Sequence, residues 1–341
     1  MKKTLLLSAG FLAALALAAC GGETASSSET SASSEGTASS EAATSEDVVF
    51  LTPTGSPSLA FYDQGDNENW TSTSDATSIP ASFAAGTYDA IVFDGANGLN
   101  VIKKNGYNYK LARWISGGNF YVVSTKHEAG DAFEGNETIQ AFNQTGNASL
   151  SFNKLATDYW KWDYEPSQVT YADGVQAVMQ TLVSNDQAYD YYVIAEPVLT
   201  NAKTQLAAKG IELNTIYNLQ TEWKEAGYGE SIPAAALFFN VDSYASKKAS
   251  LDVFLEETVE RIDTAINDPA KVVETLEAYG SATEIQARFG YQTAQVTALQ
   301  SNGENRFGLF GSDADLGGNA SFANSFWTAL GNEPFADSLF L

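Results

Sequence analysis

One pattern occurs four times along this chain: a short apolar run, a polar turn, and then a stretch with helical character. The apolar runs end at Leu51, Phe93, Phe142 and Ala195. Strands that alternate with helices in this way are typical of α/β proteins. Open α/β sheets bind ligands at the carboxyl ends of their strands, where the following helices also present free backbone N–H groups. The pattern therefore predicts an α/β fold with candidate ligand contacts in the four turns.

Local signals predict where several helices begin and which face they bury. Ser56-Pro57 supplies a cap and a first residue for the helix after the first strand. After the third strand, Phe152, Leu155 and Tyr159 share one helical face, which we expect to be buried. Residues 251–262 combine apolar residues at helical spacing with glutamates between them, which predicts an amphipathic helix.

Charge and composition exclude several classes of function. The chain has 42 acidic and 18 basic residues, a formal net charge of −24, one Cys and one His. Such a surplus of negative charge argues against nucleic-acid binding, because few cations are available to replace phosphate counterions. One Cys and one His cannot supply a Cys-based or multi-His metal site, and no nucleophile elbow, P-loop or zinc-protease motif is present. We expect no metal, no cofactor and no enzymatic activity.

Residues 1–19 have the features of a lipoprotein signal peptide. Two lysines precede an apolar run too short to span a bilayer, and Leu17-Ala18-Ala19-Cys20 resembles a bacterial lipobox. We expect Cys20 to be acylated and to anchor the mature chain in the lipid bilayer at the outer face of a bacterial plasma membrane. The alternative is an ordinary cleaved signal peptide followed by a chance cysteine. Residues 20–46 are rich in Ser and Glu and have no large apolar side chain, which predicts a disordered tether.

Five segments carry a resemblance to a known family. They are VVFLTPTGSPSLAF, YDAIVFDGANGLNVIKKNG, GGNFYVVSTK, YDYYVIAEPVLTNAK and SIPAAALFFNVD, in this order along the chain. Behind a lipobox and a tether, they resemble the substrate-binding lipoproteins of ABC importers. More narrowly, residues 48–280 look like the nitrate/sulfonate/taurine (NitT/TauT) family, which includes binding proteins for thiamine-precursor pyrimidines. The resemblance implies a small-molecule ligand, and ABC permease and ATPase subunits as partners of a monomer.

The resemblance also implies a two-lobed type II periplasmic-binding-protein-like fold with a ligand cleft between the lobes. Lobe one would consist of residues 47–120 and 236–341, and lobe two of residues 121–235. Strands at 119–126 and 232–240 would cross between them. Polar and glycine residues of the four turns, and a tryptophan near a crossing, would bind the ligand: Thr54, Gly55, Ser56, Asp94, Asn97, Trp114, Asn143, Thr145, Gly146 and Glu196.

Two carboxylates in these turns bear on the charge of the ligand. Glu196 would accept hydrogen bonds from an amine-bearing ligand, or it would only cap the helix that follows it; Asp94 has the same two interpretations. A carboxylate in the cleft disfavours an anion, so the sequence favours a neutral or amine-bearing small molecule. Phe93, Trp160 and Trp162 are either aromatic walls of the cleft or core residues. The alternative function is a membrane-tethered surface receptor or adhesin without a transporter.

Overall fold

The structure is a computed structural model that describes residues 43–301 and 303–341. The predicted signal peptide, the predicted acylation site Cys20 and most of the predicted tether lie outside the described residues. The last tether residues contact the folded body. The Ser45 hydroxyl donates to the Glu257 carboxylate at 2.5 Å, and the Glu46 carbonyl accepts from the Asn69 side chain at 2.7 Å. Residues 43–341 form one unit by their contacts.

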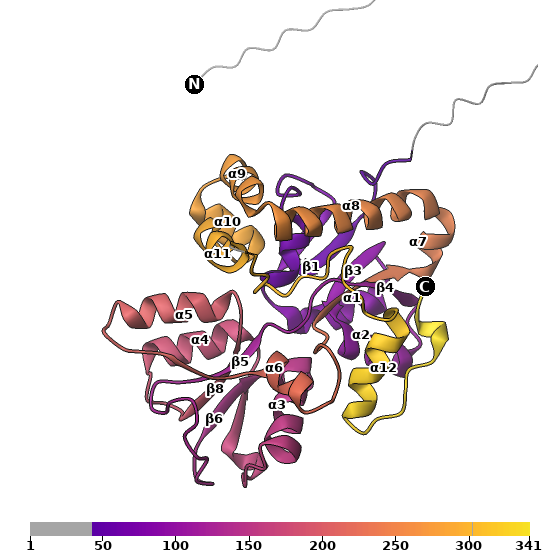
Figure 1. The fold of residues 1–341 in the computed structure, drawn as a ribbon. Helices are drawn as coiled ribbons and strands as arrows, with labels where there is room; N and C mark the ends of the chain where they lie inside the picture. Colours follow the sequence, from indigo (N-terminus) through magenta and orange to yellow (C-terminus); the bar gives the residue numbers. More distant parts are fainter. Residues whose placement is uncertain (1–42, 302) are drawn as a thin grey trace, which may run out of the picture. The chain divides into compact units, whose positions relative to one another are not determined.

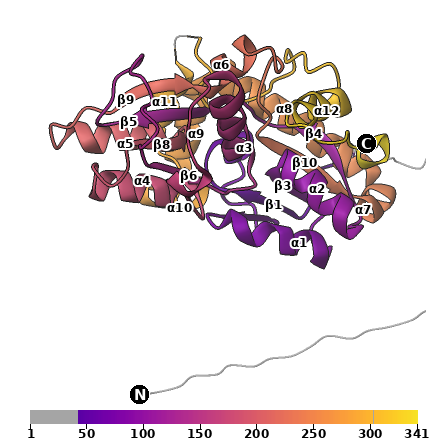
Figure 2. The ribbon, with the colours of Figure 1, turned by 90° about the horizontal axis from the view of Figure 1, so that it is seen from below.

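Two five-stranded mixed sheets organise this unit (Figures 1 and 2). The first sheet has the order β2-β1-β3-β10-β4, with strands β1 (Phe50–Pro53), β2 (Trp70–Thr73), β3 (Ala90–Asp94), β4 (Tyr109–Trp114) and β10 (Ala235–Asn240). The second has the order β7-β6-β8-β5-β9, with strands β5 (Phe120–Ser124), β6 (Ile139–Phe142), β7 (Val169–Ala172), β8 (Tyr191–Ala195) and β9 (Asn214–Asn218). In each sheet four strands run in the same direction, and the strand that follows a crossing from the other sheet, β10 or β5, is antiparallel to both of its neighbours. The predicted two-lobed α/β fold is therefore present, and we call the first sheet with its helices lobe one and the second lobe two.

Helices cover both faces of both sheets. Those of lobe one are η1 (Ser56–Phe61), η2 (Ala76–Ser78), α1 (Ile79–Ala85), α2 (Gly95–Asn105), α7 (Val241–Ser246), α8 (Lys248–Asn267), α9 (Pro269–Tyr279), α10 (Ala282–Phe289), α11 (Thr293–Gln300), α12 (Asn319–Ala329) and η5 (Asp337–Leu339). Those of lobe two are α3 (Asn147–Lys154), the π-helical turn η3 (Leu155–Tyr159), η4 (Pro166–Gln168), α4 (Val175–Ser184), α5 (Val198–Ala207) and α6 (Leu219–Glu225). In Figure 1, α8 lies on one side of the first sheet and α2 and α12 on the other, while α4 and α5 lie opposite α3 and α6 about the second sheet.

Alternation along the central strands explains why both faces need a cover. In β3, Ala90 and Val92 pack with the α8 side of the core, whereas Ile91 and Phe93 pack with the α2 side. Successive side chains of a strand point to opposite faces, so an apolar run such as this buries both faces of the sheet. The amphipathic helix predicted for residues 251–262 is the middle of α8.

Three chain segments meet where the two sheets join. The first crossing runs between β4 and β5, and the second leads from α6 into β10. They run side by side, because Gly118 N–H donates to the Ile232 carbonyl and Ala234 N–H to the Ser116 carbonyl, both at 2.9 Å. The C-terminal segment is the third: its Leu309 forms an isolated antiparallel β-bridge with Ser116 of the first crossing. The two crossings thus precede most of the predicted segments 119–126 and 232–240, whose residues belong mainly to β5 and β10.

Two local predictions were wrong. Ser56 does not cap an α-helix: it is the first residue of a 3-10 helix whose cap position is Gly55, and its hydroxyl binds the Phe307 carbonyl instead. Tyr159 is not on the buried face with Phe152 and Leu155, since it is 38% exposed. The π-helical turn at residues 155–159 adds a residue to the repeat and rotates Tyr159 away from the core.

Candidate functional site

A cavity of about 470 Å³ lies between the two lobes. Its walls come from the residues that follow strands β1, β2 and β3 of lobe one and strands β6, β7 and β8 of lobe two. Both crossings contribute as well, through Ser116 and Asn119 from the first and Ala234 from the second. The cavity therefore lies at the carboxyl ends of the parallel strands, as expected for an open α/β sheet.

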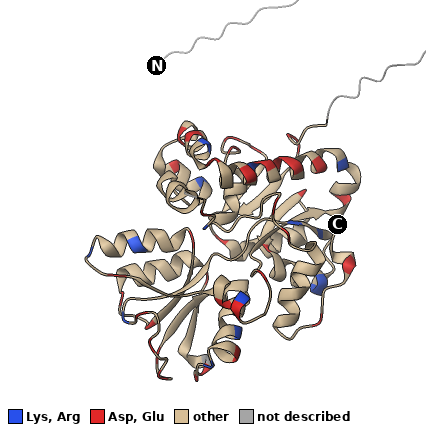
Figure 3. Ribbon diagram, viewed as in Figure 1, with Lys and Arg blue, Asp and Glu red and all other residues tan. Residues whose placement is uncertain are grey.

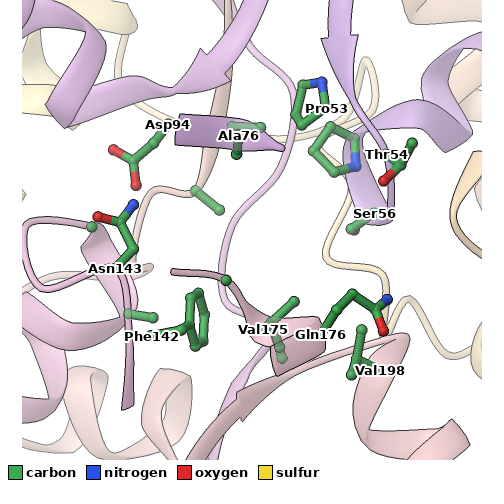
Figure 4. Close-up of a pocket in the computed structure, with 18 of the residues that line it drawn as sticks. Pro53, Thr54, Ser56, Ala76, Asp94, Phe142, Asn143, Val175, Gln176 and Val198 are labelled. Carbon is green, nitrogen blue, oxygen red and sulfur yellow. The ribbon is translucent and has the colours of Figure 1, made fainter. Parts of the chain in front are cut away.

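Most of the candidate residues predicted from the sequence lie in this cavity wall. Figure 4 shows several of them around the open space, with Asp94 beside Asn143 on one side and Thr54 and Ser56 on the other. The candidates that line the cavity are Thr54, Gly55, Ser56, Asp94, Asn143, Gly146 and Glu196. The backbone of the first turn is held closely from behind, because Gly55 N–H donates to the Phe289 carbonyl at 2.7 Å. At Gly290, where φ is +82°, a Cβ atom would lie 2.6 Å from the Gly55 nitrogen, so only glycine fits.

Three predicted candidates lie elsewhere. Asn97 and Thr145 line a second hollow, between α2, α3 and the C-terminal end of α12. Trp114 is fully buried beneath α2 and α12: its indole N–H donates to the Asn319 carbonyl at 3.1 Å, and its ring packs edge-on against Phe322. Trp114 is therefore a core residue, and we do not retain it as a ligand contact.

Of the three other aromatic candidates, Phe93 lines the cavity and the two tryptophans do not. Phe93 is 4% exposed and belongs to the core of lobe one, yet it also forms part of the cavity wall. Trp160 stacks on Tyr217 with ring centroids 4.0 Å apart, and Trp162 stacks on Phe133 at 4.3 Å. Neither tryptophan lines the cavity, because both pack into an aromatic cluster of lobe two.

Asp94 connects the two lobes at one end of the cavity. It is the last residue of β3, and one of its carboxylate oxygens accepts from Asn97 N–H at 2.9 Å, which caps α2 of its own lobe. The other oxygen accepts at 3.1 Å from the N–H of Asn147, the first residue of α3 in lobe two. Burial raises the pKa of Asp94 to about 6, although the two N–H groups act in the opposite direction. Asp94 therefore caps two helices that belong to different lobes.

Asn147 was not among the sequence candidates. It is 1% exposed and lines the cavity, and its side-chain amide donates to the Pro233 carbonyl at 2.7 Å. Its side-chain carbonyl oxygen is buried and has no hydrogen-bond partner among the described residues. Buried acceptors are normally paired, so the lack of a partner sets this oxygen apart from the other polar atoms of Asn147.

Glu196 lines the cavity but uses its acceptors within the protein. Its carboxylate caps α5 by accepting from Thr200 N–H at 2.9 Å and from the Thr200 hydroxyl at 3.1 Å. It also forms an ion pair with Arg306 of lobe one at 2.5 Å, and the Glu196 side chain is fully buried. Nearby, the Gln295 side chain donates to the Pro197 carbonyl at 2.8 Å, a second contact between the lobes. Of the two interpretations of Glu196, the geometry favours the helix cap.

The cavity wall is partly apolar and partly acidic. Pro53, Phe142, Val175 and Val198 present apolar surface (Figure 4). The cavity wall contains four acidic residues and, among the described residues, no Lys, Arg or His: the acids are Asp75, Asp94, Asp173 and Glu196. Figure 3 shows how unevenly charge is distributed elsewhere, with acidic side chains following one another along α8.

Two further lining segments have the same strand–turn–helix pattern as the four predicted turns. Strand β7 is followed by Asp173 and Gly174 and then by α4, which repeats the strand–turn–helix pattern. Strand β2 is followed in the same way by Ser74 and Asp75. Both turns line the cavity, so the pattern occurs six times rather than four. Arg306, by contrast, is 110 residues from Glu196 and carries no local signal.

The described part of the chain has neither a cluster of metal ligands nor a helix that could span a membrane. Within residues 43–301 and 303–341 no cluster of three or more His, Cys, Asp or Glu side chains could hold a metal ion. No helix in these same ranges is both long enough and apolar enough to cross a bilayer.

Several of the solved structures that resemble this chain are proteins of transport systems. An ABC transporter from Parabacteroides distasonis matches with a TM-score of 0.63 at 15% identity, over 86% of this chain and 98% of that one. The ligand-binding component of an ABC-type import system from Staphylococcus aureus, solved with zinc bound, matches with a TM-score of 0.62 at 12% identity, over 86% and 94%. The periplasmic sulfonate-binding protein SsuA from Methylobacillus flagellatus matches with a TM-score of 0.54 at 16% identity, over 83% and 87%.

These likenesses establish the fold. At identities of 12–16% the chain shares with these proteins the two-lobed architecture of periplasmic binding proteins, in agreement with the strand order of its two sheets. No protein-family model matches the sequence, and the comparison with curated proteins finds no match.

Proposed function

We propose that this chain is an extracytoplasmic solute-binding protein that captures a small molecule and delivers it to an ABC permease. The observation that carries the proposal is the cavity of about 470 Å³ between the lobes, with walls from both lobes and from both crossings. A cavity of this size suits a small organic molecule. Walls that belong to two lobes joined by a narrow connection can close on a ligand and open to release it, and the ligand shifts the balance toward closure.

The fold likeness supports the same proposal. The similar structures from Parabacteroides and Staphylococcus belong to ABC systems, and the structure from Methylobacillus is a periplasmic sulfonate-binding protein. We further propose a relation to the NitT/TauT family, on the order of the five sequence segments, and acylation of Cys20 as the anchor to the membrane. Both rest on the sequence.

Capture can be tested without knowledge of the ligand. The purified full-length chain is incubated with a bacterial metabolite extract, desalted, and analysed by native mass spectrometry before and after denaturation. We expect a bound molecule whose mass, after release, equals that of a compound in the extract, because the protein returns its ligand unchanged.

A matched pair of variants links the bound molecule to the cavity. Ala76 lines the cavity, whereas Ala84 is exposed on α1 of the same lobe. Ala76→Trp should abolish capture by filling the space, and Ala84→Trp should capture as the wild type does. No bound molecule from any extract, or equal capture by both variants, would contradict the proposal.

A further inference from the structure

The end of the cavity at Asp94 contains more hydrogen-bond acceptors than donors. The Asp94 carboxylate offers about four acceptor positions and uses two of them on Asn97 and Asn147 N–H. The Asn147 carbonyl oxygen is buried and has no partner among the described residues. The same residue donates its N–H to Asp94, so the unpaired oxygen and the carboxylate belong to one local group.

No positive side chain offsets this group. The cavity wall has no Lys, Arg or His among the described residues, and the ion pair of Arg306 is made with Glu196. The neighbouring Asn143 contributes a neutral amide (Figure 4). An anionic ligand at this end would meet a carboxylate and an unpaired carbonyl with no compensating cation, which is unfavourable at short range.

The rest of the wall combines apolar side chains with neutral polar ones such as Thr54, Ser56 and Gln176. Pro53, Val175 and Val198 present hydrocarbon surface to the cavity (Figure 4). A ligand that fills the space can bury an apolar body there while its polar group reaches Asp94.

We propose that the cavity recognises a cationic N–H donor, an amine, amidine or guanidinium on a small apolar body, and that Asp94 and Asn147 bind this head group. The inference rests on the proposed function as a solute-binding protein and specifies its substrate class. Asp94 belongs to lobe one and Asn147 to lobe two, so a head group bonded to both bridges the lobes. Recognition of the head group is thereby coupled to closure of the cleft.

Three planar compounds of nearly equal size test the charge preference. Benzamidine is a cation with N–H donors, benzamide is a neutral donor, and benzoate is an anion. Their dissociation constants are measured at pH 7.5 by calorimetry on the purified full-length chain. We expect benzamidine to bind the wild type at least tenfold more tightly than benzoate, because a hydrogen bond to a charged group in a dry site is worth about this much.

Two variants separate the charge of Asp94 from the general acidity of the protein. Asp94→Asn removes the charge and keeps one carbonyl oxygen, which can accept from one of the two helix N–H groups, and it should reduce the preference for benzamidine over benzoate to threefold or less. Asp313→Asn removes a charge from an exposed residue of the same lobe that does not line the cavity, and it should leave the preference as in the wild type. Melting temperatures show that each variant is folded.

The outcomes distinguish this inference from the proposed function. Equal binding of benzamidine and benzoate, an unchanged preference in Asp94→Asn, or no binding of benzamidine at 10 mM would overturn the inference. None of these results affects capture from the metabolite extract, which depends on no particular charge. A protein that captures nothing from any extract would remove the proposed function itself.

Discussion

At the scale of single residues, Asp94 makes the protein sensitive to pH. Burial raises its pKa to about 6, against an ordinary value near 3.8, even though two backbone N–H groups favour the carboxylate. The folded state therefore binds this proton more tightly than the unfolded state does. Between these two values the free energy of unfolding falls as the pH rises, because the buried group must lose its proton.

We predict that Asp94→Asn removes this dependence. The free energy of unfolding of the wild type, measured relative to the variant, should fall by up to about 3 kcal/mol between pH 4 and pH 7. Urea denaturation at a series of pH values gives this difference, and Asp173→Asn, in which Asp94 is intact, serves as the control. A constant difference between wild type and Asp94→Asn would show that Asp94 titrates in the folded protein as it does in the unfolded chain.

Glu196 leads to the opposite kind of prediction, an effect on stability without an effect on affinity. Glu196→Ala removes the cap of α5 and leaves Arg306 without its carboxylate partner. It should lower the free energy of unfolding by roughly 1–3 kcal/mol. The affinity for benzamidine should stay within about twofold of the wild type, because the acceptors of Glu196 are already used. A tenfold loss of affinity with an unchanged melting temperature would instead make Glu196 a ligand contact.

These two residues show what sequence reasoning could and could not predict about the site. Both were candidates because they follow buried strands, and the ends of parallel strands converge in space. Their roles depend on partners far away in the sequence: Arg306 for Glu196, and Asn147 of the other lobe for Asp94. Trp114 failed as a candidate for the same reason, since its ring direction is set by packing against α12.

At the scale of elements, the join between the lobes depends on a close backbone approach. Gly117 N–H donates to the Gly308 carbonyl at 2.8 Å, and a Cβ atom at Gly308 would lie 1.9 Å from the Gly117 oxygen. Helix α12, farther along the same C-terminal segment, packs into both lobes, with Phe322 in the core of lobe one and Phe326 in that of lobe two. No local feature of the sequence indicates this packing, because contacts between distant segments leave no periodic signal.

Two glycines in the C-terminal segment allow the contact at the join to be tested. Gly308 and Gly303 both have positive φ, +69° and +79°, but only Gly308 has atoms within 4 Å of the Cβ position. Gly303→Ala should therefore cost about 1–2 kcal/mol of stability from backbone strain alone. Gly308→Ala should cost at least about 2 kcal/mol more, because backbone atoms of the first crossing must move. Equal losses in the two variants, measured by chemical denaturation, would mean that the C-terminal segment does not press against the crossing in solution.

At the scale of the whole molecule, the negative net charge of the chain opposes attachment to an anionic membrane. The chain has a formal net charge of −24, so anionic lipid headgroups repel the folded body. Acidic residues follow one another along α8 (Figure 3), and Glu256 and Glu260 of this helix are exposed. Retention at a membrane would require an attachment strong enough to outweigh this repulsion, and acyl chains on Cys20, as we propose, would supply it.

Fractionation of cells can test whether acylation of Cys20 outweighs the electrostatic repulsion. In a bacterial host that acylates lipoproteins, the wild-type chain should sediment with membranes and stay there in 1 M salt, because acyl chains hold it independently of charge. Cys20→Ala should move the chain into the soluble or secreted fraction, or leave it unprocessed with its signal peptide, as fractionation and intact-mass measurement would show. Ser26→Ala, within the predicted tether, is the control and should fractionate as the wild type does. A Cys20→Ala chain that is cleaved normally and still resists the salt wash would exclude Cys20 as the anchor, since a body of this charge has no electrostatic means of staying bound.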